Sequence, residues 1–160
     1  MSMTLVQTYT VPTNGVVNFT ISNIPQTGKD LMILWSARSE TSAASIDFIP
    51  NTTGFSGNER RIDGNGSNVS SGTSFNPRMT VSSDTSNTFG NGMVYFPNYT
   101  SSQTKIAYHD NVTENAGTTA WQQFGTMTQS TTAPITAMFI RGNGGQDINQ
   151  NSTFSLYIIS

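Results

Sequence analysis

The sequence predicts an all-β protein, an antiparallel β-sandwich of the jelly-roll type, and three observations lead to this fold class. Short segments alternate apolar and polar residues, which is the period of a half-buried strand. Glycine, proline and asparagine residues, which favour turns, separate these segments. No segment has the spacing of an amphipathic helix. The predicted strands cover residues 5–11, 17–21, 31–35, 46–49, 93–99, 104–108, 120–127, 135–141 and 154–159, with weaker candidates at 60–62 and 79–81.

Residues 19–38, FTISNIPQTGKDLMILWSAR, are expected to organise the fold as two strands joined by a polar turn. Apolar and polar residues alternate over 17–21, so one face of the first strand is apolar. The turn falls at 25–28, where proline fixes φ and glycine tolerates positive φ. The apolar run 31–34, followed by Trp35, has no polar face. This second strand is therefore expected between two layers, at the centre of the sandwich.

The remaining segments are predicted in chain order. Residues 1–10 carry no charged side chain. They can either remain unattached to the domain or form an extended arm that packs on a neighbouring molecule. Residues 51–72 and 74–91 are loop-rich, which is typical of surface that contacts a partner. Pro97 places its strand at an edge or at a bend.

The composition indicates one domain, residues 1–160, with an unusual surface. A chain of 160 residues buries roughly two-thirds of its unfolded surface and folds without disulfide or metal staples. Only 10% of the residues are charged, against a typical value of about 25%. Serine, threonine, asparagine, glutamine and glycine must therefore supply most of the solvated surface, as in extracellular or particle-exposed β proteins.

Charge and hydropathy exclude two classes of partner. The net charge is −2 and Arg60–Arg61 is the only adjacent basic pair, whereas proteins that bind nucleic acid carry a basic stripe. No apolar run approaches the roughly 18 residues of a membrane-spanning helix, and the first residues do not resemble a secretory signal. We therefore expect neither a nucleic acid nor a membrane as partner. The chain also has no cysteine, so it has no thiolate ligand or nucleophile.

The sequence contains no recognisable set of catalytic residues, so the chain is not expected to be an enzyme. His109 and Asp110 form the only pair that contains histidine, and no nucleophile elbow or metalloprotease helix accompanies them. Asp47, Glu59 and Asp63 are available as a carboxylate pair for polysaccharide cleavage. Solvated or arginine-paired loop residues explain these acids better.

Two loops partly match a calcium-binding pattern. Residues 147–151 supply oxygen ligands at alternate positions, but Ser152 stands where an EF-hand needs glycine and Ile158 where it needs glutamate. Residues 63–67 deviate in the same way. Polar hairpin loops explain both segments, and we expect no metal and no cofactor.

The candidate contact residues are aromatic and basic. Trp121, Tyr95 and Tyr99 offer apolar ring faces with polar edges, which suit a partner protein or a glycan. Arg60 and Arg61 lie in the loop-rich middle of the chain. The alternative is that most of these rings belong to the core or to a subunit interface.

Several segments resemble one family of proteins. FTISNIPQTGKDLMILWSARS is similar to a segment of bacteriophage virion proteins that pairs an IPQT turn with an apolar strand ending in a small residue and arginine. FIPNTTGFSG, RRIDGNGSNVSSG and MVYFPNYTSSQTKIAYH resemble further parts of that family. APITAMFIRGNGGQDINQNSTFSLYIIS resembles its C-terminal hairpin, except that Ile158 stands where the family often has glycine.

This resemblance implies a structural protein of the virion, used in capsid decoration, head fibres or tail fibres. The leading expectation is a homotrimeric cement protein on the capsid surface that binds the major capsid protein and stabilises the assembled head. The alternative is a tail-fibre or spike module that recognises a glycan on the host surface.

Overall fold

The computed structural model describes residues 2–42, 45–52, 58–74, 76–115, 119–129 and 132–160. Within these ranges it contains eleven strands and one short 3-10 helix, η1 (Asn143–Gly145). The strands are β1 (Met3–Thr10), β2 (Asn18–Ile21), β3 (Asp30–Ala37), β4 (Ile46–Pro50), β5 (Glu59–Gly64), β6 (Val69–Gly72), β7 (Gly90–Phe96), β8 (Lys105–Asn115), β9 (Thr119–Gln129), β10 (Met138–Gly142) and β11 (Thr153–Ile159).

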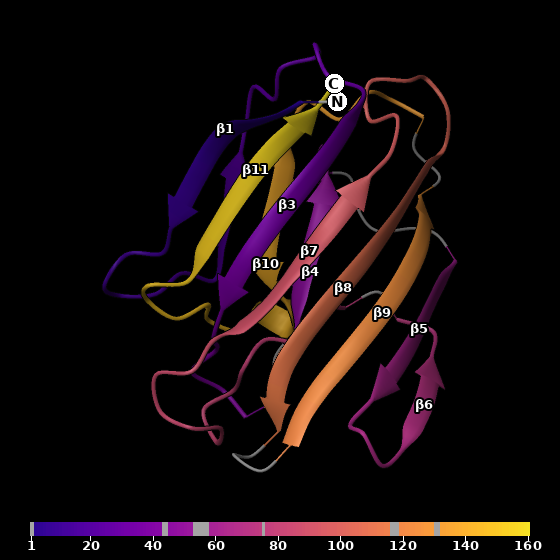
Figure 1. Ribbon diagram of the computed structural model, residues 1–160. Coiled ribbons are helices and arrows are strands. Elements are labelled where there is room, and N and C mark those ends of the chain that lie inside the picture. The colour runs from indigo at the N-terminus through magenta and orange to yellow at the C-terminus, as the bar shows by residue number, and fades with distance from the viewer. Residues whose placement is uncertain (1, 43–44, 53–57, 75, 116–118, 130–131) are drawn as a thin grey trace.

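The strands form two antiparallel sheets that lie face to face (Figure 1). The larger sheet has eight strands in the order β1-β11-β3-β7-β8-β9-β5-β6, and the smaller has three in the order β2-β10-β4. The predicted all-β, antiparallel β-sandwich is confirmed. Among the described residues its eleven strands are divided eight to three, where the sequence predicted nine strands and two weaker candidates.

The smaller sheet covers the half of the larger sheet that contains β1, β11, β3 and β7 (Figure 1). Aromatic rings join the two layers. Phe154 of β11 lies 5.1 Å from Phe19 of β2 and 6.4 Å from Phe48 of β4, measured between ring centroids. Tyr9 of β1 stacks on Phe19 at 3.9 Å. Burial of these apolar side chains is the main force that holds the sheets together.

The other half of the larger sheet extends beyond the smaller one, and residues 76–89 lie across part of its inner face. Thr80 in this segment shares a hydrogen bond with Thr113 of β8 at 3.1 Å, and the side-chain amide of Asn111 donates to the carbonyl of Arg78 at 3.3 Å. Besides the apolar Ala107 and Met127, many inner positions of β8 and β9 are buried but polar. They include Lys105, His109, Asn111, Thr113, Gln123 and Gln129.

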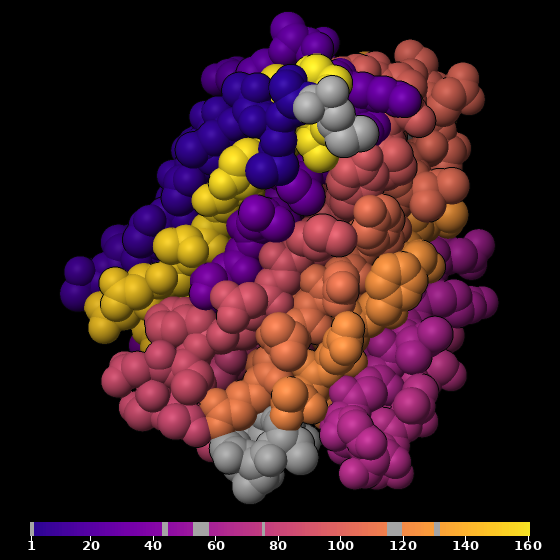
Figure 2. Space-filling view, viewed as in Figure 1, coloured from indigo at the N-terminus to yellow at the C-terminus, as the bar shows by residue number. Residues whose placement is uncertain are grey.

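The opposite side of the larger sheet, called the outer face from here on, is not covered by any described element (Figure 2). In β3, Leu31 and Ile33 point inward and are fully buried, whereas Leu34 points outward and is 37% exposed. The expectation that the apolar run 31–34 lies between two layers is thus wrong for this chain alone. β3 does lie among the inner strands of its sheet, but only one of its faces is covered.

The expected pairing of the strands on either side of the 25–28 turn is also wrong. β2 pairs with β10 in the smaller sheet, whereas β3 pairs with β11 and β7 in the larger one. The connection crosses from one layer to the other because the apolar faces of both strands must meet in the same core. β10 and β11 are divided between the sheets in the same way, so they form no paired hairpin.

Several predicted boundaries change. β8 and β9 each have eleven residues and pair along their whole length, which is longer than predicted. β6, with the polar sequence VSSG, is not among the predicted strands. In the predicted strand at 79–81, Thr80 makes only an isolated bridge. β7 ends at Phe96, immediately before Pro97, in agreement with a bend at that proline.

The segment proposed as an N-terminal arm forms β1, which pairs antiparallel with β11 at one edge of the larger sheet. Backbone hydrogen bonds join Ser2 to Ser160 in both directions, so the two ends of the described chain lie side by side. In the part of the chain that the structure describes, no helix has the length and hydrophobicity needed to cross a membrane.

Candidate interaction surfaces

The outer face gathers most of the exposed large hydrophobic side chains. Among the described residues there are nine, and the strand register places eight of them on this face. They are Met3, Leu5, Leu34, Ile62, Val69, Ile106, Val112 and Phe124. The ninth, Val17, precedes β2 on the other side of the molecule. Antiparallel sheets with a solvated face normally present polar residues there, so this distribution marks a contact surface.

A row of aromatic side chains crosses the middle of the outer face. Tyr95 of β7 lies 5.2 Å from Tyr108 of β8, and Tyr108 lies 6.1 Å from Phe124 of β9, between ring centroids. Ile62 of β5 continues the row, because it is the register partner of Phe124. Charged residues at outward positions of the described strands are few, namely Asp30, Arg60, Asp110 and Glu114. Burial of this face therefore removes few charges from water.

Two hollows of about 440 and 450 Å³ flank the Ile62–Phe124 pair. Thr126 and Ser71 line the first, and Val112 and Val69 line the second. Such hollows beside projecting apolar side chains allow interdigitation with a partner surface.

A separate cleft of about 390 Å³ opens on the inner side of the sandwich, where the larger sheet extends past β4. We call it the inner cleft. Strands β5 and β9 form one wall, and the residues around η1 form another. Its lining is almost entirely polar and consists of Ser45, Arg61, Asp63, Asn76, Arg78, Trp121, Gln123, Asn143 and Gln146.

Hydrogen bonds fix the wall of the inner cleft. Arg61 Nε donates to Asp63 Oδ2 at 2.8 Å, and Gln123 Nε2 donates to Asp63 Oδ1 at 2.6 Å. Gln123 Oε1 accepts from the backbone N–H of Arg78 at 2.8 Å and from Asn111 Nδ2 at 3.2 Å. Asp63 and Gln123 are almost fully buried, so their charges and dipoles are held in place.

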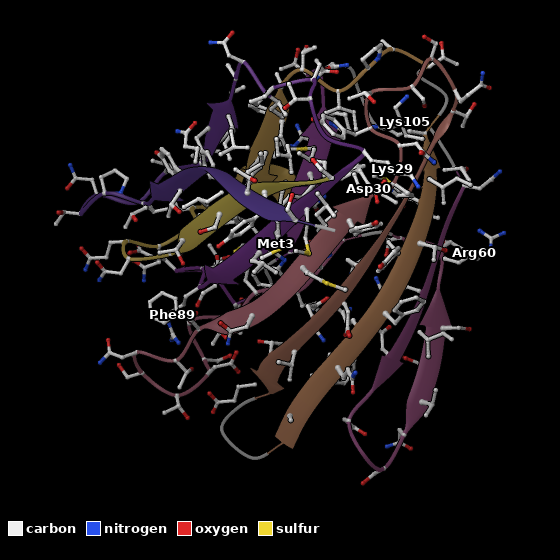
Figure 3. All side chains as sticks on the ribbon, turned by 45° about the horizontal axis from the view of Figure 1, so that its top comes forward. Met3, Lys29, Asp30, Arg60, Phe89 and Lys105 are labelled. Carbon is white, nitrogen blue, oxygen red and sulfur yellow. The ribbon has the colours of Figure 1, made fainter. Side chains whose placement is uncertain are left out.

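The five contact residues predicted from the sequence are distributed over three places. Trp121 and Arg61 both line the inner cleft. Tyr95 and Arg60 belong to the outer face, and Arg60 projects away from the sheet (Figure 3). Tyr99 is fully buried, and its hydroxyl donates to the carbonyl of Pro25, so the expectation that Tyr99 contacts a partner or glycan is not met in the folded chain.

His109 lies inside the molecule rather than at a strand end. Its Nδ1 is 2.9 Å from Oδ1 of Asn111, and burial lowers the pKa of the imidazole to about 4. Gly125 of β9 packs directly against the ring, because a Cβ atom there would lie 2.1 Å from Nε2. His109 follows the strand predicted at 104–108, and it is buried because β8 continues to Asn115.

Asp47 and Asp63 are engaged in ion pairs. Asp47 accepts hydrogen bonds from Arg141 Nε at 2.8 Å and Asn143 Nδ2 at 2.9 Å. Asp63 is paired with Arg61. Glu59 is partly exposed at the start of β5. These contacts agree with the arginine-paired interpretation of Asp47 and Asp63.

The two calcium-like loops have other structural roles. Asn65 Oδ1 accepts hydrogen bonds from the backbone N–H groups of Ser67 and Asn68, which closes the β5–β6 hairpin. Ile148 and Asn149 form backbone hydrogen bonds with Val16 and Arg38, so the loop before β11 is tied to the segments that precede β2 and follow β3. Among the described residues, no group of three acidic, histidine or cysteine side chains is arranged to hold a metal ion.

Sequence reasoning missed Arg78, Asn143 and Gln146 as cleft residues. Arg78 lies in the segment before β7, Asn143 lies in η1 and Gln146 directly follows η1, and only the tertiary structure brings them to β5 and β9. The sequence offered one indication that Arg78 belongs to a binding site, because it is one of only seven lysine and arginine residues in the chain.

In comparisons with known proteins, no family model, no curated protein and no solved structure matches this chain.

Proposed function

We propose that this chain is a non-enzymatic structural protein of a bacteriophage particle, a homotrimeric decoration protein on the capsid surface. The resemblance of its IPQT and STFSLY segments to phage virion proteins supports this assignment. The observation that carries it is the outer face, where a partner can bury eight exposed hydrophobic side chains.

The outer face is large enough for a specific interface. Eight strands of four to eleven residues, spaced by about 4.8 Å and rising about 3.3 Å per residue, present roughly 1,000 Å². This area is of the same order as the ~800 Å² per partner that stable protein–protein interfaces bury. The low charge of the face favours association because few ionic groups lose their hydration.

Another copy of the chain is the proposed first occupant. The apolar run in β3 has the composition of a strand covered on both faces, yet the chain itself covers one. In a closed ring of three copies, each outer face contacts a different surface of the next copy, as the heterologous interfaces of cyclic trimers do.

Binding to the major capsid protein then accounts for decoration. A trimer that binds only the assembled lattice stabilises it by mass action at every equivalent position. The polar, charge-poor remainder of the surface suits a protein exposed on a particle.

The location test separates heads from tails of purified particles on a gradient and quantifies this chain against the major capsid protein. Hundreds of copies in the head fraction, on the order of one per few capsid subunits, are expected from symmetric binding. A few copies in the tail fraction would overturn decoration.

The interface test uses a matched pair of variants. Ile62→Glu places a charge on the outer face, where Ile62 is 56% exposed, and Val17→Glu places the same charge at a 40% exposed position elsewhere. Light scattering at micromolar concentration should show a trimer for the parent and for Val17→Glu, and monomers for Ile62→Glu. A monomeric parent, or equal dissociation of both variants, contradicts assembly through the outer face.

A second candidate function is adsorption to the host, as a tail-fibre or spike module that binds a surface glycan. The inner cleft favours it, because Trp121 and polar groups converge there. Loss of whole-cell binding in Trp121→Ala, with unchanged oligomeric state, would support this function, and absence of binding by the parent counts against it.

A further inference from the structure

We propose that the inner cleft binds an acidic saccharide, with Arg78 holding its carboxylate and Trp121 and Gln146 bonding its hydroxyl groups. The choice of a saccharide rests on the second candidate function. The cleft lies on the side of the larger sheet opposite the outer face. Binding of a saccharide in the cleft and self-association of the chain through the outer face can therefore be tested separately.

The positive charge of the inner cleft comes from Arg78. Arg61 is neutralised by Asp63 at 2.8 Å and also donates to Ser74. The exposed guanidinium of Arg78 forms no ion pair with a described residue and lies over the indole ring of Trp121, 4.9 Å from its centroid. A planar guanidinium binds carboxylates through two parallel hydrogen bonds, so Arg78 provides an anchor for an acidic group.

The cleft also contains a donor and an acceptor whose hydrogen-bonding capacity is unused. Trp121 Nε1 and Gln146 Oε1 are both shielded from water, and neither has a hydrogen-bond partner among the described residues. Such groups destabilise a protein until a partner is supplied. A hydroxyl group can accept from the indole N–H and donate to the amide oxygen, and a sugar carries several hydroxyls in fixed positions.

Access to these groups depends on Arg78. Its side chain is exposed, and only its main chain is fixed, by bonds to Gln123 and Asn111. The guanidinium is therefore able to turn from the indole ring toward an anion and uncover the ring. A cation–π contact at an exposed site is weaker than a charge-assisted hydrogen bond to a carboxylate.

The remaining properties of the cleft fit this class of ligand. Its volume of about 390 Å³ lies within the range of small-molecule sites. Asp63 and Gln123 are buried and bonded to each other, so the wall is in place before binding. Apart from Trp121 the lining offers polar side chains, which favours a hydroxylated ligand over an apolar one.

The test titrates the intact chain with a short oligogalacturonate and with a short oligosialate, by calorimetry and tryptophan fluorescence. Saturable binding of at least one is expected, and methyl esterification of its carboxylates should weaken binding about tenfold or more, because a charge-assisted bond is lost. Absence of binding by both probes at millimolar concentration, or equal affinity for the esterified form, overturns the proposal.

Two arginine variants make the test specific. Arg78→Gln should weaken binding about tenfold or more, whereas Arg60→Gln, the same charge change on the outer face, should leave it within about twofold. Trp121→Phe should weaken binding to a similar extent as Arg78→Gln while keeping an aromatic ring. Equal losses in the two arginine variants would reveal non-specific attraction and exclude the cleft. If neither probe binds while Trp121→Ala still abolishes adsorption to cells, the ligand class is wrong and the adsorption function stands.

Discussion

The hydroxyl of Tyr95 donates a hydrogen bond to Oδ2 of Asp30 at 2.5 Å, which ties the end of β7 to the first residue of β3 on the outer face. Asp30 Oδ1 also accepts from the backbone N–H of Asn98 at 2.9 Å. The carboxylate is largely buried, so these two bonds replace part of its lost hydration. The Tyr95 bond is therefore expected to affect stability measurably.

Tyr95→Phe should lower the free energy of unfolding by about 1.5 kcal/mol, since a hydrogen bond to a charged group is lost. Tyr108→Phe is the matched control, because Tyr108 is the register partner of Tyr95 and its hydroxyl forms no hydrogen bond with a described residue. Urea denaturation of both variants measures the difference. Equal stability of the two variants would show that the Asp30 bond contributes nothing.

Alkaline pH should destabilise the folded protein through the same hydrogen bond between Tyr95 and Asp30. The hydrogen bond to Asp30, together with burial and the charge of Asp30, raises the pKa of Tyr95 from 10.0 to about 12. The protonated form is thus favoured in the folded state, so this stabilisation is complete below pH 10 and is lost as the pH rises toward 12. Between these values the parent should lose more stability than Tyr95→Phe. Identical alkaline profiles would contradict the assigned pKa.

Acidic pH should destabilise the protein through its single histidine. Burial lowers the pKa of His109 from 6.5 to about 4, despite the hydrogen bond that its Nδ1 donates to Asn111 Oδ1. The neutral ring is favoured in the folded state, so its contribution is complete above pH 6.5 and is lost as the pH falls toward 4. Stability at pH 5 relative to pH 7 should fall more in the parent than in His109→Gln. A parallel decline in both proteins would assign the acid sensitivity to carboxylates instead.

Gly125→Ala should destabilise the protein by about 1–3 kcal/mol, because the added methyl group overlaps the buried ring of His109. Gly64→Ala in β5 is the control, since the nearest atom to its added Cβ lies 3.9 Å away. Thermal unfolding reports both. The double variant Gly125→Ala, His109→Ala should lose less stability than the two single changes added together, and simple additivity would rule out the direct contact.

Substitution of Asn51 should destabilise the protein for two separable reasons. Its backbone has φ of 53°, and its side chain accepts hydrogen bonds from the N–H groups of Thr136 and Ala137 and donates to the carbonyl of Pro134. Asn51→Ala loses the bonds and strains the backbone, whereas Asn51→Gly loses only the bonds. Chemical denaturation should show both variants destabilised, with alanine worse by about 1 kcal/mol. Equal values would mean that the positive φ is accommodated without strain.

The strands themselves could be predicted from the sequence because their signal is local. Alternation in the segments around Phe19 and Phe154 reflects a period of two residues that any half-buried strand must show. β6 was missed because VSSG contains one apolar residue, and its pairing with β5 depends on the turn that Asn65 closes.

Pairing partners and covered faces could not be predicted in the same way. The apolar run of β3 indicated that both faces of the strand are covered. Such a run does not reveal whether the second face is covered by the same chain or by another molecule. β2 and β3 are adjacent in sequence and lie in different sheets, because each pairs with a strand more than 100 residues later in the chain as well as facing a shared core.

The sequence by itself determined an all-β, charge-poor chain and the positions of most of its strands, because periodicity and composition act over a few residues. The tertiary structure decided that Trp121 and Arg61 share a cleft with Arg78, that Tyr95 lies on an uncovered face and that Tyr99 is in the core. These placements depend on pairings between distant segments. Their free energy comes from burying both apolar faces together, which no single segment encodes.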